Sequence, residues 1–247
     1  MPASCSSITV FRRHEATGMI PYVPRLTMEE WQTIFLTLRV AGLAVGVGLP
    51  LALMLAWLLE SRFPGRFLIN ALVYLPLALP PVVTGWLLLM LCGVEGPVGG
   101  MLNRRFGIQL AFTTEGAALA CGVMVLPLMV RAIGQGLESI DPGLKQAART
   151  LGAGPIDRFF TISLPLAAPG VLLAAVLGFT ASLGEFGAVI TFAANIPGQT
   201  RTLPLAIYSA LQAVDGEAEA TRLALCSVAL ALIGLVTAER IALRLRR

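Results

Sequence analysis

Long apolar blocks separated by short polar segments dominate this 247-residue chain. A helix that crosses the hydrocarbon core of a bilayer needs about 20 apolar residues, and runs near that length without Asp, Glu, Lys or Arg are typical of such helices. They predict five crossings, at residues 40–59 (extended past Arg39 by 31–38), 67–91, 116–130 (continuing past Arg131 to Leu137), 165–184 and 223–238. We therefore expect an all-α, polytopic integral membrane protein.

A further apolar segment, residues 203–214, is too short to cross the core as a straight helix. It predicts a re-entrant or tilted element at the outer mouth, and a sixth full crossing stays open as the alternative. Prolines inside 67–91 and 165–184 free backbone carbonyls, which neighbouring protein or a water-filled cavity must satisfy. These two helices are therefore our candidates for lining a pathway.

The positions of the basic residues suggest an orientation. If the polar segment 138–164 is cytoplasmic, five crossings place the N-terminus outside and the C-terminus inside. Ten basic residues then lie on the inner side and seven on the outer side, a small excess in the direction of the positive-inside rule. Arginines at the C-terminal end of the chain contribute to that excess.

Residues 1–30 form a polar N-terminal tail with neither a spanning run nor a signal-peptide pattern. We expect the transmembrane domain to occupy residues 31–247. Met28 is followed by Glu-Glu-Trp and leads directly into the first apolar block, which suggests the hypothesis that translation begins there.

Charged residues make up 13% of the chain, about half the share of an ordinary soluble domain, and hydrophobic residues make up 56%. This composition excludes a water-soluble globule. The single lysine, Lys145, is followed by Gln146, so the chain has no phosphate-binding G-x-x-x-x-G-K-[ST] loop. One histidine and four cysteines without C-x-x-C spacing indicate neither a zinc site nor a Ser-His-Asp relay. We expect no enzymatic activity, no cofactor and no metal.

Residues 138–165 are the one long polar stretch with helix signals at both ends. Asp141 is a good N-cap, and the proline after it suits the first helical position. Gly152 is placed to close that helix in the left-handed conformation. Pro155 then starts a second short helix, which we expect Pro165 to stop.

The first of these short helices has one apolar face of low profile, with basic residues on its flanks. Leu144, Ala147, Ala148 and Leu151 form the face, and Lys145 and Arg149 lie beside it. Such a face permits docking in a groove of a partner. Packing on the membrane surface or on the protein's own bundle is an equally good interpretation from the residues alone.

The same segment resembles a known motif. Gln146-Ala-Ala, then Gly152, then Ile162-Ser-Leu-Pro165 is similar to the EAA loop of the permease subunits of bacterial binding-protein-dependent ATP-binding cassette importers, with Gln146 in place of the usual Glu. The resemblance implies that residues 138–165 are a cytoplasmic coupling loop that docks in a groove of an ATPase subunit. The implied docking residues are Gln146, Ala147, Ala148 and Gly152, supported by Leu144 and Leu151.

Two further stretches, 182–190 and 195–204, resemble the molybdate and sulfate branch of these permeases, and residues 146–164 are most similar to the molybdate members. The resemblance implies an ATP-driven importer of a tetrahedral oxyanion, with molybdate expected and sulfate, thiosulfate or tungstate as alternatives. A membrane-embedded enzyme, such as a lipid phosphotransferase, is the alternative from another class. It would need clustered Asp, His or Lys at one interface, and the sequence has no such cluster.

The resemblance also implies the partners. They are a second permease subunit in a homodimer, two ATP-binding cassette ATPase subunits, and a periplasmic or lipid-anchored oxyanion-binding protein. The expected location is the inner membrane of a bacterial cell, surrounded by lipid, and no nucleic acid is involved.

Glu185 follows the fourth apolar block near the expected outer boundary. Acidic residues at membrane depth are normally functional, but a carboxylate would repel a divalent oxyanion. One interpretation is an ion pair with an arginine such as Arg201 that fixes the outer loop. The other is a gate formed by Gly184, Glu185, Phe186 and Gly187, in which the glycines give the backbone freedom to rearrange.

Overall fold

The computed structural model describes residues 26–61 and 63–245, with the side chains of residue 238 and of residues 241–245 left aside. The proposed tail at 1–30 therefore lies mostly outside the described residues. In the described part of this tail, Thr27 is the N-cap of the first helix. The hypothesis that translation begins at Met28 stays a prediction.

The described residues form helices joined by short loops, and no strand occurs among them. In chain order they are α1 (Met28–Glu60), α2 (Arg66–Ala78), α3 (Pro81–Cys92), α4 (Pro97–Phe106), α5 (Thr114–Glu138), α6 (Pro142–Thr150), α7 (Pro155–Arg158), the π-helical turn η1 (Phe159–Ser163), α8 (Leu164–Leu183), α9 (Gly187–Phe192), α10 (Leu203–Gln212) and α11 (Glu217–Leu245).

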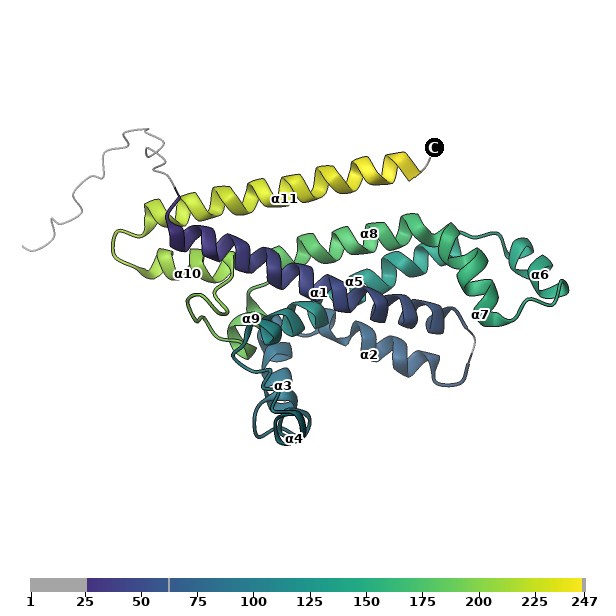
Figure 1. Ribbon diagram of the computed structural model, residues 1–247, viewed down its shortest axis with the longest axis horizontal. Coiled ribbons are helices and arrows are strands. Elements are labelled where there is room, and N and C mark those ends of the chain that lie inside the picture. Colours follow the sequence, from purple (N-terminus) through teal and green to yellow (C-terminus); the bar gives the residue numbers. More distant parts are fainter. Residues whose placement is uncertain (1–25, 62, 246–247) are drawn as a thin grey trace, which may run out of the picture.

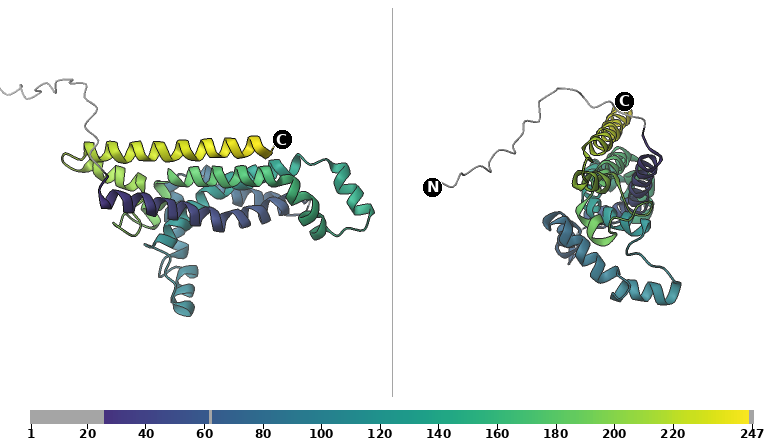
Figure 2. Two further views of the ribbon diagram at one scale, coloured as in Figure 1. Left: turned by 45° about the horizontal axis from the view of Figure 1, so that its top comes forward. Right: turned by 90° about the vertical axis from the view of Figure 1, so that its left-hand side faces the viewer.

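The long helices lie side by side, with α5 packed along both α1 and α8 (Figures 1 and 2). Helices α1 and α5 run in parallel, because Arg39 forms an ion pair with Glu115 at 3.4 Å, Ala44 lies near Gly122, and Gly48 lies against Met129. Helix α8 runs the opposite way, because Cys121 contacts the carbonyl of Ser182 while Gly136 lies against Gly170. We call the end of the bundle beside α6 the α6 end, and the end beside α10 the α10 end.

Four helices are long and apolar enough to cross a membrane, and the number is five if the bent pair of α2 and α3 counts as one span. Because α1 and α5 run in parallel, the chain between them must return from the α6 end to the α10 end. The pair supplies that return, so the predicted five crossings agree with the packing. The segment predicted at 203–214 is the ten-residue α10, which is too short to add a sixth crossing.

The second crossing is not the single helix expected over residues 67–91. Its axis turns by 118° between α2 and α3. Leu79 is extended (φ −92°, ψ 148°) because a residue before proline is disfavoured in the helical region, and neither Pro80 nor Pro81 has an N–H to donate. Helix α3 therefore leaves the bundle and points, with α4, away from the long helices (Figure 1).

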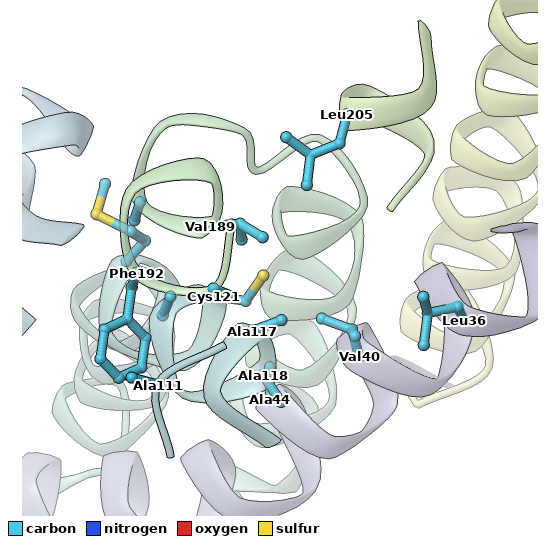
Figure 3. Packing of buried hydrophobic residues seen from close by; sticks show 14 residues of the cluster. Leu36, Val40, Ala44, Ala111, Ala117, Ala118, Cys121, Val189, Phe192 and Leu205 are labelled. Atoms are coloured by element: carbon cyan, nitrogen blue, oxygen red, sulfur yellow. The ribbon is translucent and has the colours of Figure 1, made fainter. Parts of the chain in front are cut away.

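Buried apolar residues form a core around α5. In Figure 3, Val189 and Phe192 of α9 gather with Ala117 and Cys121 of α5, and all four are fully buried. Many of the other core residues are alanine, and small residues let membrane helices approach closely. The short helix α9 is thus fixed between α5 and α3.

An ion pair joins α1 and α11 at the α10 end. Arg222 of α11 contacts Glu30 of α1 at 2.8 Å, and Glu30 also accepts the N–H of Thr27 at 2.7 Å. Close by, the hydroxyl of Thr37 accepts the N–H of Leu203 at the start of α10. Helices α1, α10 and α11 are therefore joined by polar contacts in addition to apolar packing.

Candidate functional site: a projecting loop and the turn before α9

Helix α6 projects past the ends of the long helices (Figure 1). It begins where the sequence predicts: the carboxylate of Asp141 accepts the N–H of Gly143 at 2.7 Å, and Pro142 occupies the first turn. It ends at Thr150, and Gly152 has φ +85°, the left-handed conformation that favours glycine. The predicted helix and its glycine turn are confirmed.

The second short helix begins at Pro155, as predicted, but the prediction that Pro165 stops it is wrong. The chain continues through η1 into α8, so that residues 155–183 form one span of 29 residues. Pro165 lies in the first turn of α8, directly after the π-helical turn. Such a turn shifts the backbone hydrogen-bond register by one residue. The residue that follows it can therefore lack an N–H, as proline does, without breaking a hydrogen bond of the helix.

Helix α6 has an outward face and an inward face. Leu144 and Leu151 are 50% and 88% exposed, and Gln146, Ala147 and Gly152 are exposed as well. Ala148, by contrast, is buried and 8% exposed. The structure thus brings five of the six implied docking residues to the surface and places Ala148 against the protein itself.

Two residues of this loop, Lys145 and Phe159, hold its inward side. The ammonium group of Lys145 forms an ion pair with Glu60, the last residue of α1, and donates to the carbonyl of Leu137 at 3.1 Å. The rings of Trp57 and Phe159 lie 5.0 Å apart between α1 and η1. The loop therefore rests on the ends of α1 and α5.

A polar cavity of about 300 Å³ opens at the same end, between α1, α2 and α5. Guanidinium and amide groups are typical donors to oxyanions. Its polar lining residues are Glu60, Arg66, Asn70, Tyr74, Arg131, Gln135 and Glu138. The two carboxylates balance the two guanidinium groups, so this cavity has no net positive charge. Within the described residues, no group of three or more His, Cys, Asp or Glu could hold a metal ion.

The expected ion pair between Glu185 and Arg201 is wrong. The carboxylate of Glu185 accepts the N–H of Ala188 at 2.9 Å and so binds the start of α9, while Arg201 donates to the side chain of Asn195 at 3.0 Å. Each group has a local partner, which removes the reason for a longer-range pair.

The residues around Glu185 form a compact turn. Gly184 is exposed, and Phe186 packs against Tyr208 of α10, with ring centroids 5.1 Å apart. A Cβ on Gly187 would lie 2.6 Å from the Cβ of Pro81. Gly187 therefore permits close approach to α3 rather than the backbone freedom that the sequence suggested.

The sequence did not predict two ion pairs between residues far apart in the chain. Lys145 appeared there only as a flanking charge and Glu60 not at all, although they are partners across 85 residues. A signal was present, because Lys145 is the one lysine of the chain and Glu60 ends the first apolar block. The pair of Glu30 and Arg222, 192 residues apart, left no comparable signal.

Comparisons with known proteins agree with this architecture. Residues 48–245 match the family model of the "binding-protein-dependent transport system inner membrane component". The chain is 52% identical to the molybdenum transport system permease protein ModB of Escherichia coli K12, over 88% of this chain and 95% of that protein. It is 42% identical to the sulfate transport system permease protein CysT of Salmonella typhimurium, over 66% of this chain and 59% of that protein.

Among solved structures, a bacterial ABC transporter involved in the import of alginate superimposes with a TM-score of 0.72, covering 90% of this chain and 82% of that chain at 19% identity. This likeness concerns the fold alone. The family model and the sequence relatives establish that the chain belongs to the family of inner membrane components of binding-protein-dependent transport systems.

Proposed function

We propose that this chain is the membrane-spanning permease subunit of an ATP-driven importer of a tetrahedral oxyanion, and that the oxyanion is molybdate. The observation that supports this most strongly is the 52% identity with a molybdenum transport permease over nearly the full length of both chains. The protein contributes the pathway, and a separate ATPase subunit contributes the energy.

The exposed apolar face of α6 supports docking of such a subunit. Leu144 lies on the projecting helix α6, and Leu151, which is almost entirely exposed, lies in the turn that follows it. Apolar side chains on a projecting helix fit the helix-in-groove mode of recognition. Gln146, Ala147 and Gly152 complete the proposed docking surface. Ala148 acts from the inward side, by letting α6 lie close to its support.

The continuity of the span at residues 155–183 supports a route for the motion. A helix of 29 residues is about 43 Å long, and it leads from the coupling loop to the turn at Gly184, Glu185, Phe186 and Gly187. We propose that this turn is the outer gate. ATP-driven closure of the ATPase subunits would move the paired coupling loops together, and α8 would pass the displacement to α9 at the other end.

The partners follow from the proposed activity. A second copy of the chain would complete the pathway between two permease subunits. Two ATPase subunits would bind the α6 ends, and a periplasmic or lipid-anchored binding protein would deliver the oxyanion at the α10 ends. The location is the inner membrane, with the α6 end in the cytoplasm, as the excess of basic residues on that side favours.

Sulfate is the second candidate substrate, because a sulfate permease is also a relative. That likeness covers about two thirds of this chain, however, whereas the likeness to the molybdenum permease covers most of it. Both anions are tetrahedral and divalent, so discrimination depends on size and on the binding protein that delivers them.

Tracer uptake in vesicles that contain the assembled transporter and its binding protein tests the substrate. We expect radioactive molybdate to enter the vesicles and unlabelled molybdate to compete fully with it. Sulfate at about ten times the molybdate concentration should leave at least about half of the molybdate uptake. Tungstate, which is close to molybdate in size, should compete. Uptake that sulfate suppresses as well as molybdate does would contradict the assignment.

A further inference from the structure

The junction between α6 and the bundle depends on one side chain. Within residues 26–61 and 63–245, the hydrogen bonds that join α6 to another helix are both made by Lys145, one to Glu60 of α1 and one to the carbonyl of Leu137 in α5. The other hydrogen bonds of α6 are local to the loop. Ala148 is the one residue of α6 that is buried.

The charge of Lys145 matches what the two helix ends require. The last carbonyls of a helix lack partners within it, and the helix dipole makes this end negative. Neither α1 nor α5 has a basic residue in its last turn, and α1 ends on the negative Glu60. Lys145 therefore brings a positive charge to the ends of α1 and α5 at once, from a third helix.

The ion pair is shielded but not sealed. The side chains of Lys145 and Glu60 are 25% and 28% exposed. A contact of this kind can break and form again as the loop moves, whereas a fully buried pair would resist separation. The rings of Trp57 and Phe159, tilted by 41° with centroids 5.0 Å apart, hold the neighbouring part of the loop against α1.

We propose that Lys145 is the positioning residue through which displacement of α6 reaches α1 and α5, so that it couples ATP hydrolysis to transport without forming part of the docking surface. This inference rests on the proposed function, because it takes the outward face of α6 as the ATPase contact. It adds a second route to the one through α8. Leu151 faces the partner, and Lys145 faces the bundle.

The test uses the complete transporter in vesicles and measures molybdate imported per ATP hydrolysed. Lys145→Met removes the positive charge and keeps a long unbranched side chain, whereas Lys145→Arg keeps both the charge and the hydrogen-bond donors. We expect Lys145→Met to retain the bound ATPase subunits and ATP hydrolysis while the import per ATP falls about fivefold or more, and we expect Lys145→Arg to restore most of it.

A double-mutant cycle identifies the partner. Glu60→Gln should lower the same ratio, and adding it to Lys145→Met should lower the ratio no further, because the two changes break one contact. An unchanged ratio in Lys145→Met would overturn the inference. So would a parallel loss of bound ATPase, hydrolysis and uptake, which would make Lys145 a support for docking or folding only. If the unmodified chain neither binds ATPase subunits nor imports molybdate, the proposed function fails and this inference falls with it.

Discussion

Replacing Leu151 by aspartate is expected to abolish ATP-driven molybdate uptake while the protein remains folded in the membrane. Leu151 is 88% exposed and lies in the turn after α6, so the change disturbs little within the chain. In a complex the carboxylate would be carried into an apolar groove. Desolvating an unpaired charge costs several kcal/mol, and about 3 kcal/mol already weakens docking more than about 100-fold. Co-purification of the ATPase subunits measures the loss of docking, and tracer uptake measures the loss of transport.

Val214→Asp is the matched control. Val214 is 94% exposed and follows α10, at the opposite end of the bundle from α6. The same chemical change there should leave bound ATPase and ATP hydrolysis unaltered. If Leu151→Asp still binds the ATPase as the unmodified chain does, or if both variants lose it equally, the docking face has been misassigned.

The largest loss of stability is expected from Glu30→Ala. Glu30 is 4% exposed, and its side chain pairs with Arg222, which is itself 14% exposed, and also accepts the N–H of Thr27. Removing one member of a buried pair leaves an uncompensated charge, at a cost of about 3–5 kcal/mol. The midpoint of thermal unfolding in detergent should fall clearly, because α1 and α11 lose their polar contact at the α10 end.

Glu29→Ala provides the comparison at the neighbouring position. Glu29 lies in the same first turn but is exposed. Its loss removes a favourable interaction with the helix dipole, worth about 0.3–1 kcal/mol. Equal midpoints for the two variants would show that the contact between Glu30 and Arg222 adds no stability of its own.

Local signals account for what the sequence predicted well. Asp141, Pro142 and Gly152 fix the ends of α6 through bonds within a few residues, so reading them needs no knowledge of the fold. The apolar blocks predicted the long helices for a similar reason, since length and hydropathy are properties of the segment itself. Family resemblance then supplied the meaning of the loop, which residue patterns alone left open.

The errors arose where the outcome depends on neighbours. Residues 67–91 were expected to form one crossing, whereas the structure turns by 118° at Pro80 and Pro81 and packs α3 on α9. Pro165 was expected to end a helix, but a π-helical turn before it absorbs the irregularity. Glu185 has its partner three residues away rather than at Arg201. No periodicity in a sequence records which of several nearby donors a carboxylate meets.

The inward position of Ala148 has the same origin. On a helical wheel Ala148 belongs with Leu144 and Leu151. Only the packing of α6 against the bundle buries Ala148 and leaves the two leucines exposed. Lys145 of α6 pairs with Glu60 of α1, 85 residues away, where α6 meets the bundle. The family resemblance could therefore place the proposed docking surface on α6, whereas the structure was needed to separate its exposed side chains from the buried Ala148.

Accumulation of radioactive molybdate against a gradient tests the central claim most directly. Vesicles would hold the assembled transporter, with ATP supplied on the α6 side and loaded binding protein on the α10 side. We expect molybdate to accumulate above its outside concentration when both are present, and we expect omission of ATP, the ATPase subunits or the binding protein to abolish this accumulation. Accumulation by the chain without ATP or without the ATPase subunits would contradict the central claim.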